Sequence, residues 1–222
     1  MDHFYNRVPK VDGFSKISFW REDEIGIIAL LSPGRLGKET IEELIKAISL
    51  ASVDDKISGL IITGTNGFFS DGLSVPNRIA YADFRDYYQN LMNLIFVILS
   101  FDKPLISLIV GKAKNNGISL ALLSDQVIVS ENSKLIWDNN EPFVLLSTIS
   151  FKDRVRIEEN GLAIKSLTVK EPNALGDGYR ISKSILKMIN PNSRKYKYQG
   201  YDKIIIEEEI NFLDFYLWCE NK

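Results

Sequence analysis

The stretch "VGKAKNNGISLALLSDQVIVSENSKL", residues 110–135, reads as an apolar strand end, a polar loop, a short helix and a second apolar strand. Earlier in the chain, "SGLIITG" (58–64) and "PLISLIV" (104–110) have the continuous apolar character of strands covered on both faces. Between these two runs, apolar residues recur at helical spacing over 84–98. The alternation of strand and helix predicts parallel β-α-β units and therefore an α/β fold.

The N-terminal part predicts a hairpin followed by a helix. Two β-rich runs, 15–22 and 25–31, flank a charged turn, as the strands of a hairpin do. Thr40 and Glu43 fit a capping box, in which the two side chains close the first turn of a helix. The buried stripe of that helix would consist of Ile41, Leu44, Ile45 and Ile48.

The C-terminal part has a weaker pattern, and we expect only short helical stretches near 162–167 and 181–188. A longer helical period returns in the tail, where one face would carry Ile206, Ile210, Leu213 and Leu217. Other faces of this helix would carry Phe212, Phe215 and Trp218. Such a helix packs on more than one side, against its own domain or against a neighbouring subunit, and we favour the subunit. We expect a core domain over 1–185 and a helical segment over 186–222 that supports oligomerisation.

Composition and charge exclude several classes of function. A formal net charge of −2 gives no basic footprint for nucleic acid. Cys219 is the only cysteine, which excludes an intrachain disulfide and fits a reducing cytoplasm. His3 is the only histidine and lies in the terminal segment, so we expect neither a histidine triad nor a metal site. No apolar run is long enough to span a bilayer, and we expect no membrane partner.

Two polar loops follow adjacent predicted strands at the same edge of the sheet, where open α/β sheets bind their ligands. These are "TGTNGFFSDGLS" (63–74) and "GKAKNNGISL" (111–120). The second loop opens a helix, whose first amides lack intrahelical partners and favour negative charge. Two such amides that converge from two loops would form an oxyanion hole.

These loops and their neighbours resemble the crotonase superfamily, the enoyl-CoA hydratase and isomerase group. The likeness covers "GIIALLSP" (26–33), "GLIITGTNGFFSDGLS" (59–74), "FDKPLISLIVGKAKNNGISLALLSDQVIVSENSKL" (101–135) and "NALGDGYRIS" (173–182), in the family's order. The resemblance implies a crotonase-like spiral of β-β-α units with a helical C-terminal part. It also implies a cytoplasmic protein of fatty acid metabolism that forms a homo-oligomer, for which a trimer or a hexamer is expected.

By position, the resemblance assigns the two oxyanion-hole amides to Leu73 and Asn116. Backbone amides do this work, so the side chains matter only through the conformations they permit. In the family both Asn115 and Asn116 are glycines, and asparagine tolerates left-handed geometry better than most residues. A simpler interpretation is that Asn115 and Asn116 only cap the helix that follows. The two roles are compatible.

The carboxylates of the resembling hydratases are replaced in this chain. Ser119 stands at the first position and Asn139 at the second, and neither side chain exchanges a proton near neutral pH. This composition argues against ordinary hydration, which needs two poised acid-base groups. A two-residue insertion in the loop would bring Glu141 into the second position, and Asp138 is one residue away from that position on the other side. One carboxylate with two amides would suffice for double-bond isomerisation.

The expected ligand is a coenzyme A thioester, bound as substrate or ligand with no separate cofactor. Lys114, Lys112 and Arg78 lie near the two loops in sequence and are the candidates for its phosphates, although all three also fit a solvated surface. A serine peptidase of the same fold would need a nucleophile beside a base, and no such pair is available. We therefore expect an acyl-CoA protein of hydratase/isomerase descent, a lyase or isomerase with an unusual site. The alternative is a catalytically silent binding or assembly subunit.

Overall fold

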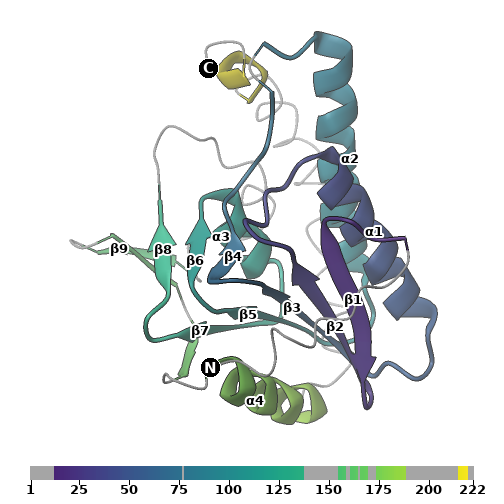
Figure 1. Cartoon of the computed structure of the whole chain (residues 1–222), viewed down its shortest axis with the longest axis vertical. Helices are drawn as coiled ribbons and strands as arrows, with labels where there is room; N and C mark the ends of the chain where they lie inside the picture. Colours follow the sequence, from purple (N-terminus) through teal and green to yellow (C-terminus); the bar gives the residue numbers. More distant parts are fainter. Residues whose placement is uncertain are drawn as a thin grey trace.

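The computed structural model describes residues 13–76, 78–137, 155–158, 161–164, 166–169, 174–188 and 215–219. Its centre is a six-stranded sheet in the order β1-β2-β3-β5-β7-β11 (Figure 1). The first two strands form an antiparallel hairpin, and each later neighbour is parallel, which confirms the predicted hairpin and α/β fold. The strands are β1 Ile17–Glu22, β2 Ile25–Leu30, β3 Gly59–Gly64, β5 Leu105–Ile109, β7 Gln126–Ser130 and β11 Leu167–Val169.

A second, smaller sheet stands beside the first (Figure 1). Its three short parallel strands are β4 Phe68–Ser70, β6 Lys112–Lys114 and β8 Lys134–Ile136. Each follows a strand of the main sheet directly along the chain, so the fold repeats a strand, a sharp turn and a short strand. This repeat is the β-β-α spiral that the resemblance implies.

One of these sharp turns requires a glycine. Gly111 has φ +90°, and a Cβ at this position would lie 2.1 Å from the Gly67 carbonyl oxygen. The amide of Lys112 donates to that same oxygen at 2.8 Å. A side chain at 111 would therefore separate the turns that follow β3 and β5.

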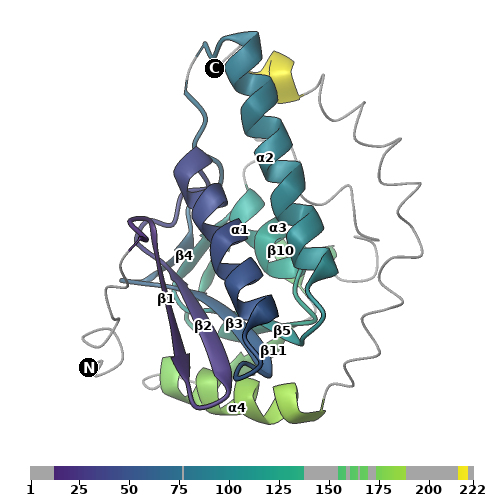
Figure 2. The ribbon, with the colours of Figure 1, turned by 90° about the vertical axis from the view of Figure 1, so that its right-hand side faces the viewer.

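Helices cover both faces of the main sheet (Figure 2). On one face, α1 Lys38–Val53 and α2 Tyr81–Ser100 pack side by side, and α3 Asn116–Leu122 is completely buried. The apolar residues predicted to recur over 84–98 are all buried. On the other face, α4 Ala174–Met188 is tied to the β1–β2 turn, where Lys183 contacts Asp23 at 2.5 Å. In the described part of the chain, no helix combines the length and apolar content that a membrane crossing needs.

The capping box predicted at the start of α1 is wrong. The helix begins after Gly37, and no side chain caps it. The Glu43 carboxylate instead accepts hydrogen bonds from the amides of Ser15, Lys16 and Ile17, at 2.7, 2.8 and 3.0 Å. The Glu43 carboxylate therefore binds backbone amides that are distant in sequence, whereas the local pattern predicts that it binds the first turn of its own helix.

The helical stretch predicted near 162–167 is also wrong. The chain forms β10 Gly161–Ile164, which pairs with β9 Val155–Glu158, and then β11 at the edge of the main sheet. The period-2 spacing of Leu162 and Ile164 and the β-branched Thr168 and Val169 favour strands. The helix predicted over 181–188 is confirmed as the second half of α4.

In the tail, residues 215–219 form a helical turn. Leu217, which the pattern places on the buried face, is 53% exposed, whereas Phe215 and Cys219 are completely buried. Phe215 packs on α2, with ring centroids 5.0 Å from Phe84 and 6.2 Å from Tyr87. The described turn therefore packs on its own domain. The other expected face residues, Ile206, Ile210, Phe212 and Leu213, lie outside the described residues.

Candidate functional site

The first candidate loop holds Leu73 in an extended conformation. Leu73 forms a parallel bridge with Leu36, in which the Leu36 amide donates to the Gly72 carbonyl at 2.8 Å. The Ser74 amide donates to the Leu36 carbonyl at 3.2 Å. Because the neighbours of Leu73 make these bonds, its own amide and carbonyl point to the side away from Leu36.

The second candidate loop is held by the backbone of Asn115. Its amide donates to the Ile136 carbonyl at 3.0 Å, and its carbonyl accepts from the amides of Ile118 and Ser119 at 2.9 and 3.1 Å. Asn115 has φ +43°, a region that glycine tolerates better than asparagine. Its side chain makes no capping hydrogen bond to α3, so the interpretation of Asn115 as a side-chain cap is wrong.

The two loops meet at a glycine. A Cβ on Gly117 would lie 2.6 Å from the Ser70 Cβ and 2.8 Å from the Ser70 carbonyl oxygen. Ser70 is completely buried, and its hydroxyl donates to the Gly34 carbonyl at 2.6 Å. Asn116 is the first residue of α3, one position before this contact, and is completely buried. The loop that carries Leu73 and the helix that begins at Asn116 are therefore fixed against each other.

The predicted acid-base positions offer little chemistry in the described residues. Ser119 is completely buried inside α3, and its hydroxyl donates at 3.4 Å to the Asn115 carbonyl one turn earlier. Such a back-bond is a common structural role for serine in a helix. Asn139, Glu141 and Asp138 lie outside the described residues.

The three predicted phosphate contacts do not form one cluster. Lys112 pairs with Asp71 at 3.4 Å and lies over the Phe68 ring at 5.5 Å. Lys114 ends the same short strand and is half-buried. Arg78 instead lines a large cavity at the other side of the first loop.

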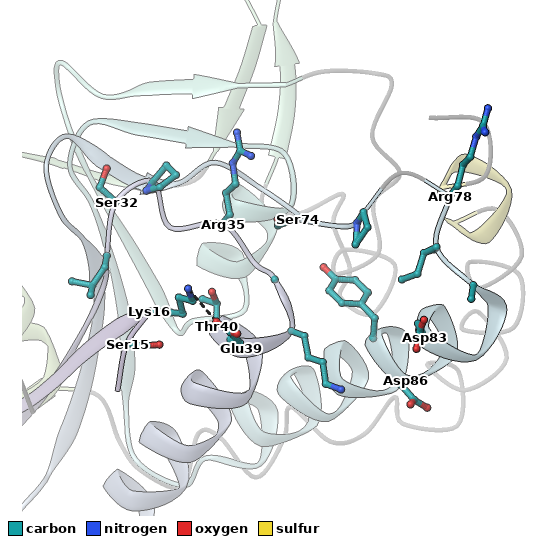
Figure 3. A pocket seen from close by; sticks show the side chains of 18 residues that line it. Ser15, Lys16, Ser32, Arg35, Glu39, Thr40, Ser74, Arg78, Asp83 and Asp86 are labelled. Atoms are coloured by element: carbon teal, nitrogen blue, oxygen red, sulfur yellow. Dashed lines mark ion pairs between the residues drawn. The ribbon is translucent and has the colours of Figure 1, made fainter. Parts of the chain in front are cut away.

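This cavity has a volume of about 1000 Å³ and lies between the N-terminal ends of α1 and α2 (Figure 3). It adjoins the Leu36–Leu73 bridge, because Arg35, Gly37 and Ser74 are part of its wall. Its charged side chains are Lys16, Arg35, Lys38, Arg78, Glu39, Asp83 and Asp86. Sequence reasoning missed Lys16, Arg35 and Lys38. Arg35 and Lys38 had a signal, because both follow a Pro-Gly turn just before a helix, whereas Lys16 had none.

Charge is unevenly distributed in the cavity. Lys16 and Glu39 form an ion pair of 3.0 Å at one end, where Ser15 and Thr40 also lie (Figure 3). Arg78 lies with Asp83 and Asp86 at the other end. Between them, Arg35 contacts Asp71 outside the cavity wall at 3.2 Å. The cavity thus offers both cations and hydroxyl groups to a polar ligand.

The two sheets, the repeated strand-turn-strand and the two facing loops define the chain as a crotonase-type α/β protein. The sequence model described as Enoyl-CoA hydratase/isomerase matches residues 22–149, more than half of the chain. The chain belongs to the enoyl-CoA hydratase/isomerase family.

Individual relatives agree with this membership. The chain is 29% identical over 124 residues to a 2,3-dehydroadipyl-CoA hydratase of Escherichia coli, covering 54% of this chain and 48% of that protein. The chain spans about half the length of the curated relatives it matches. An enoyl-CoA hydratase/isomerase structure from Mycobacterium paratuberculosis matches with TM-score 0.75 at 15% identity, covering 96% of this chain and 100% of that one. Pseudomonas aeruginosa DspI matches with TM-score 0.71 at 16% identity, covering 95% and 99%. At these identities the structural likeness supports the fold alone.

Proposed function

We propose that this protein binds a coenzyme A thioester and holds the thioester carbonyl between the backbone amides of Leu73 and Asn116. The observation that carries the proposal is the contact of Gly117 with Ser70, which fixes the two loops against each other. The extended backbone at Leu73 and the helix start at Asn116 supply one amide each. Preorganised donors of this kind stabilise the negative charge that develops on a carbonyl oxygen.

The ligand class follows from the relatives and from the cavity. The E. coli relative is named as a hydratase of a coenzyme A thioester. The cavity beside Leu73 has room for a large polar ligand, and Arg35 and Arg78 line it. Arginine suits phosphate because its planar guanidinium donates two parallel hydrogen bonds. We assign the coenzyme A moiety to this cavity, with Lys112 and Lys114 in a lesser role, because neither lysine lines it.

The proposed chemistry does not include ordinary hydration. The Ser119 hydroxyl is bonded inside α3 and has no acid-base function near neutral pH. If Glu141 reaches the thioester, one carboxylate can remove and return a proton, which is an isomerisation. Deuterium exchange at the α- or γ-carbon of crotonyl-CoA measures this step, and Glu141→Gln should abolish it. No exchange with the wild-type protein would rule out the isomerase.

A catalytically silent binding or assembly subunit is the second candidate. The observation that favours it is the complete burial of Asn116 and Ser119, which fill the region where the family has small residues or carboxylates. Such a protein would bind the thioester without turnover, or would serve only assembly.

Thermal melting with coenzyme A, butyryl-CoA and crotonyl-CoA tests the binding proposal, because a ligand of the native state raises the melting temperature. Asn116→Pro removes the backbone amide proton together with the asparagine side chain, at the first helical position, where proline is tolerated. Asn116→Gly is the matched control, which keeps that amide and removes the side chain.

We expect butyryl-CoA to raise the melting temperature of the wild type and of Asn116→Gly, and to have a much smaller effect on Asn116→Pro. A melting temperature that no coenzyme A derivative changes would contradict the proposal. A rise in melting temperature without turnover of crotonyl-CoA would favour the catalytically silent binding subunit.

A further inference from the structure

The first turn of α1 opens into the cavity. Gly37, Lys38, Glu39 and Thr40 all line it. The first intrahelical hydrogen bond runs from the Ile41 amide to the Gly37 carbonyl at 3.0 Å. The amides of Lys38, Glu39 and Thr40 come before this bond, and no group among the described residues accepts from them. Three amides with partial positive charge therefore face the cavity end of a 16-residue helix.

Thr40 gives an independent sign of a ligand. It is only 5% exposed, yet it lines the cavity and lies beside Lys16 and Glu39 (Figure 3). Among the described residues, its hydroxyl has no hydrogen-bond partner. Its hydroxyl oxygen is not one of the buried polar atoms that lack a partner in the described residues, so it is open to the cavity that Thr40 lines. A ligand that accepts from the hydroxyl would explain the threonine.

The charges around this turn favour an anion. Lys16 and Lys38 line this end of the cavity. Of the nearby acids, Glu39 pairs with Lys16 at 3.0 Å, and Glu43 accepts from the amides of Ser15 and Lys16. The remaining acids of the cavity, Asp83 and Asp86, lie at the opposite end with Arg78 (Figure 3).

We propose that the N-terminus of α1 is a phosphate-binding site. The phosphate oxygens accept from the amides of residues 38–40 and from the Thr40 hydroxyl, while Lys16 and Lys38 balance the charge. The phosphate is either free in solution or part of coenzyme A, and only the second case rests on the function proposed above.

Phosphate titrations at constant ionic strength test the site, with chloride as the reference anion. We expect inorganic phosphate to raise the melting temperature of the wild type and of Thr40→Ser, which keeps the hydroxyl. Thr40→Val, which removes the hydroxyl at similar volume, should lose the phosphate effect. Lys38→Gln should weaken phosphate binding roughly tenfold, as expected for a charge-assisted contact, whereas Lys56→Gln, outside the cavity, should not. Glu39→Gln should strengthen it by removing a negative charge.

The same variants distinguish the two sources of phosphate. If Thr40→Val weakens the binding of coenzyme A as much as the binding of inorganic phosphate, the site holds a phosphate of the bound coenzyme. If coenzyme A binding is unchanged while phosphate binding is lost, the site takes free phosphate or another phosphorylated molecule. If the protein binds phosphate but not butyryl-CoA, the proposed function is refuted and the phosphate site at the start of α1 is still supported. A wild type that responds equally to phosphate and chloride, or a Thr40→Val that keeps the phosphate effect, would overturn the site.

Discussion

At the scale of single residues, Asn115 is where the chain departs most from the family pattern. Its φ of +43° is held by backbone hydrogen bonds on both sides, to the Ile136 carbonyl and from the amides of Ile118 and Ser119. A non-glycine residue in a sparsely populated region costs about 1–3 kcal/mol and is a frequent feature of functional loops. The chain keeps the loop geometry at the expense of stability.

Asn115→Gly should therefore raise the free energy of unfolding by about 1 kcal/mol, since the released strain exceeds the extra chain entropy of glycine. Asn115→Ala is the comparison variant and should lower it, because alanine tolerates positive φ less well than asparagine. Urea denaturation measures both changes. A glycine variant less stable than the wild type would show that the asparagine side chain contributes more than its backbone costs.

Positions of single residues were predictable wherever a motif fixes a turn. The loops of Leu73 and Asn116 lie where the resemblance places them, because strand ends and glycines set both turns. The partner of Lys112 was not predictable. A sequence shows that a lysine is close to a loop, but not that Asp71 faces it across two strands.

At the scale of elements, Glu43 joins α1 to the start of β1. Burial by itself would raise the pKa of this carboxyl, but hydrogen bonds from the amides of Ser15, Lys16 and Ile17 and from the Ser15 hydroxyl outweigh it, and the pKa is lowered. A carboxyl whose pKa is lower in the folded state stabilises the fold above its unfolded pKa. This stability is lost as the pH falls through the folded pKa.

Glu43→Gln should therefore be less stable than the wild type at pH 7. The difference should shrink on acidification below the ordinary glutamate pKa of about 4.3. Denaturation midpoints measured from pH 7 to pH 3 provide the test. Glu42→Gln, an exposed neighbour, should have little effect at any pH. A constant difference between Glu43→Gln and the wild type over this range would contradict an ionic contribution.

The helical turn at 215–219 is the element whose packing the sequence left most open. Phe215 lies among Phe84, Tyr87 and Tyr88 of α2. Phe215→Ala should lower the free energy of unfolding by about 3 kcal/mol, the scale of a buried aromatic truncation. Leu217→Ala, at an exposed position of the same turn, should change it little. Equal effects of the two variants would contradict packing on the protein's own α2.

Elements that bury a continuous apolar run or one full helical stripe were predictable, whereas the segment 161–169 after β8 was not. The predicted runs at 58–64, 104–110 and 84–98 correspond to β3, β5 and α2, because each buries a continuous run or one full stripe. The segment 161–169 forms strands, because its short apolar runs gain pairing partners that a local pattern does not reveal.

At the scale of the whole molecule, the spiral places the first loop beside the second and the cavity beside the first loop (Figures 1 and 3). At the opposite edge of the sheet, Asp125 joins the starts of β5 and β7, because its carboxylate and its amide both bond to the backbone of Leu105, at 2.8 Å each. The homo-oligomer, the cytoplasmic location and the role in fatty acid metabolism stay predictions, as does the division at residue 185.

The central claim is that two backbone amides polarise a thioester carbonyl. Difference infrared spectroscopy of butyryl-CoA, labelled with carbon-13 at the carbonyl, tests it most directly in the bound state. Two hydrogen bonds to one oxygen weaken the C=O bond, so the account predicts a carbonyl band at lower frequency on the wild-type protein than in water. The band should move back toward its value in water on Asn116→Pro. A bound thioester whose carbonyl band matches that of free butyryl-CoA would contradict the account.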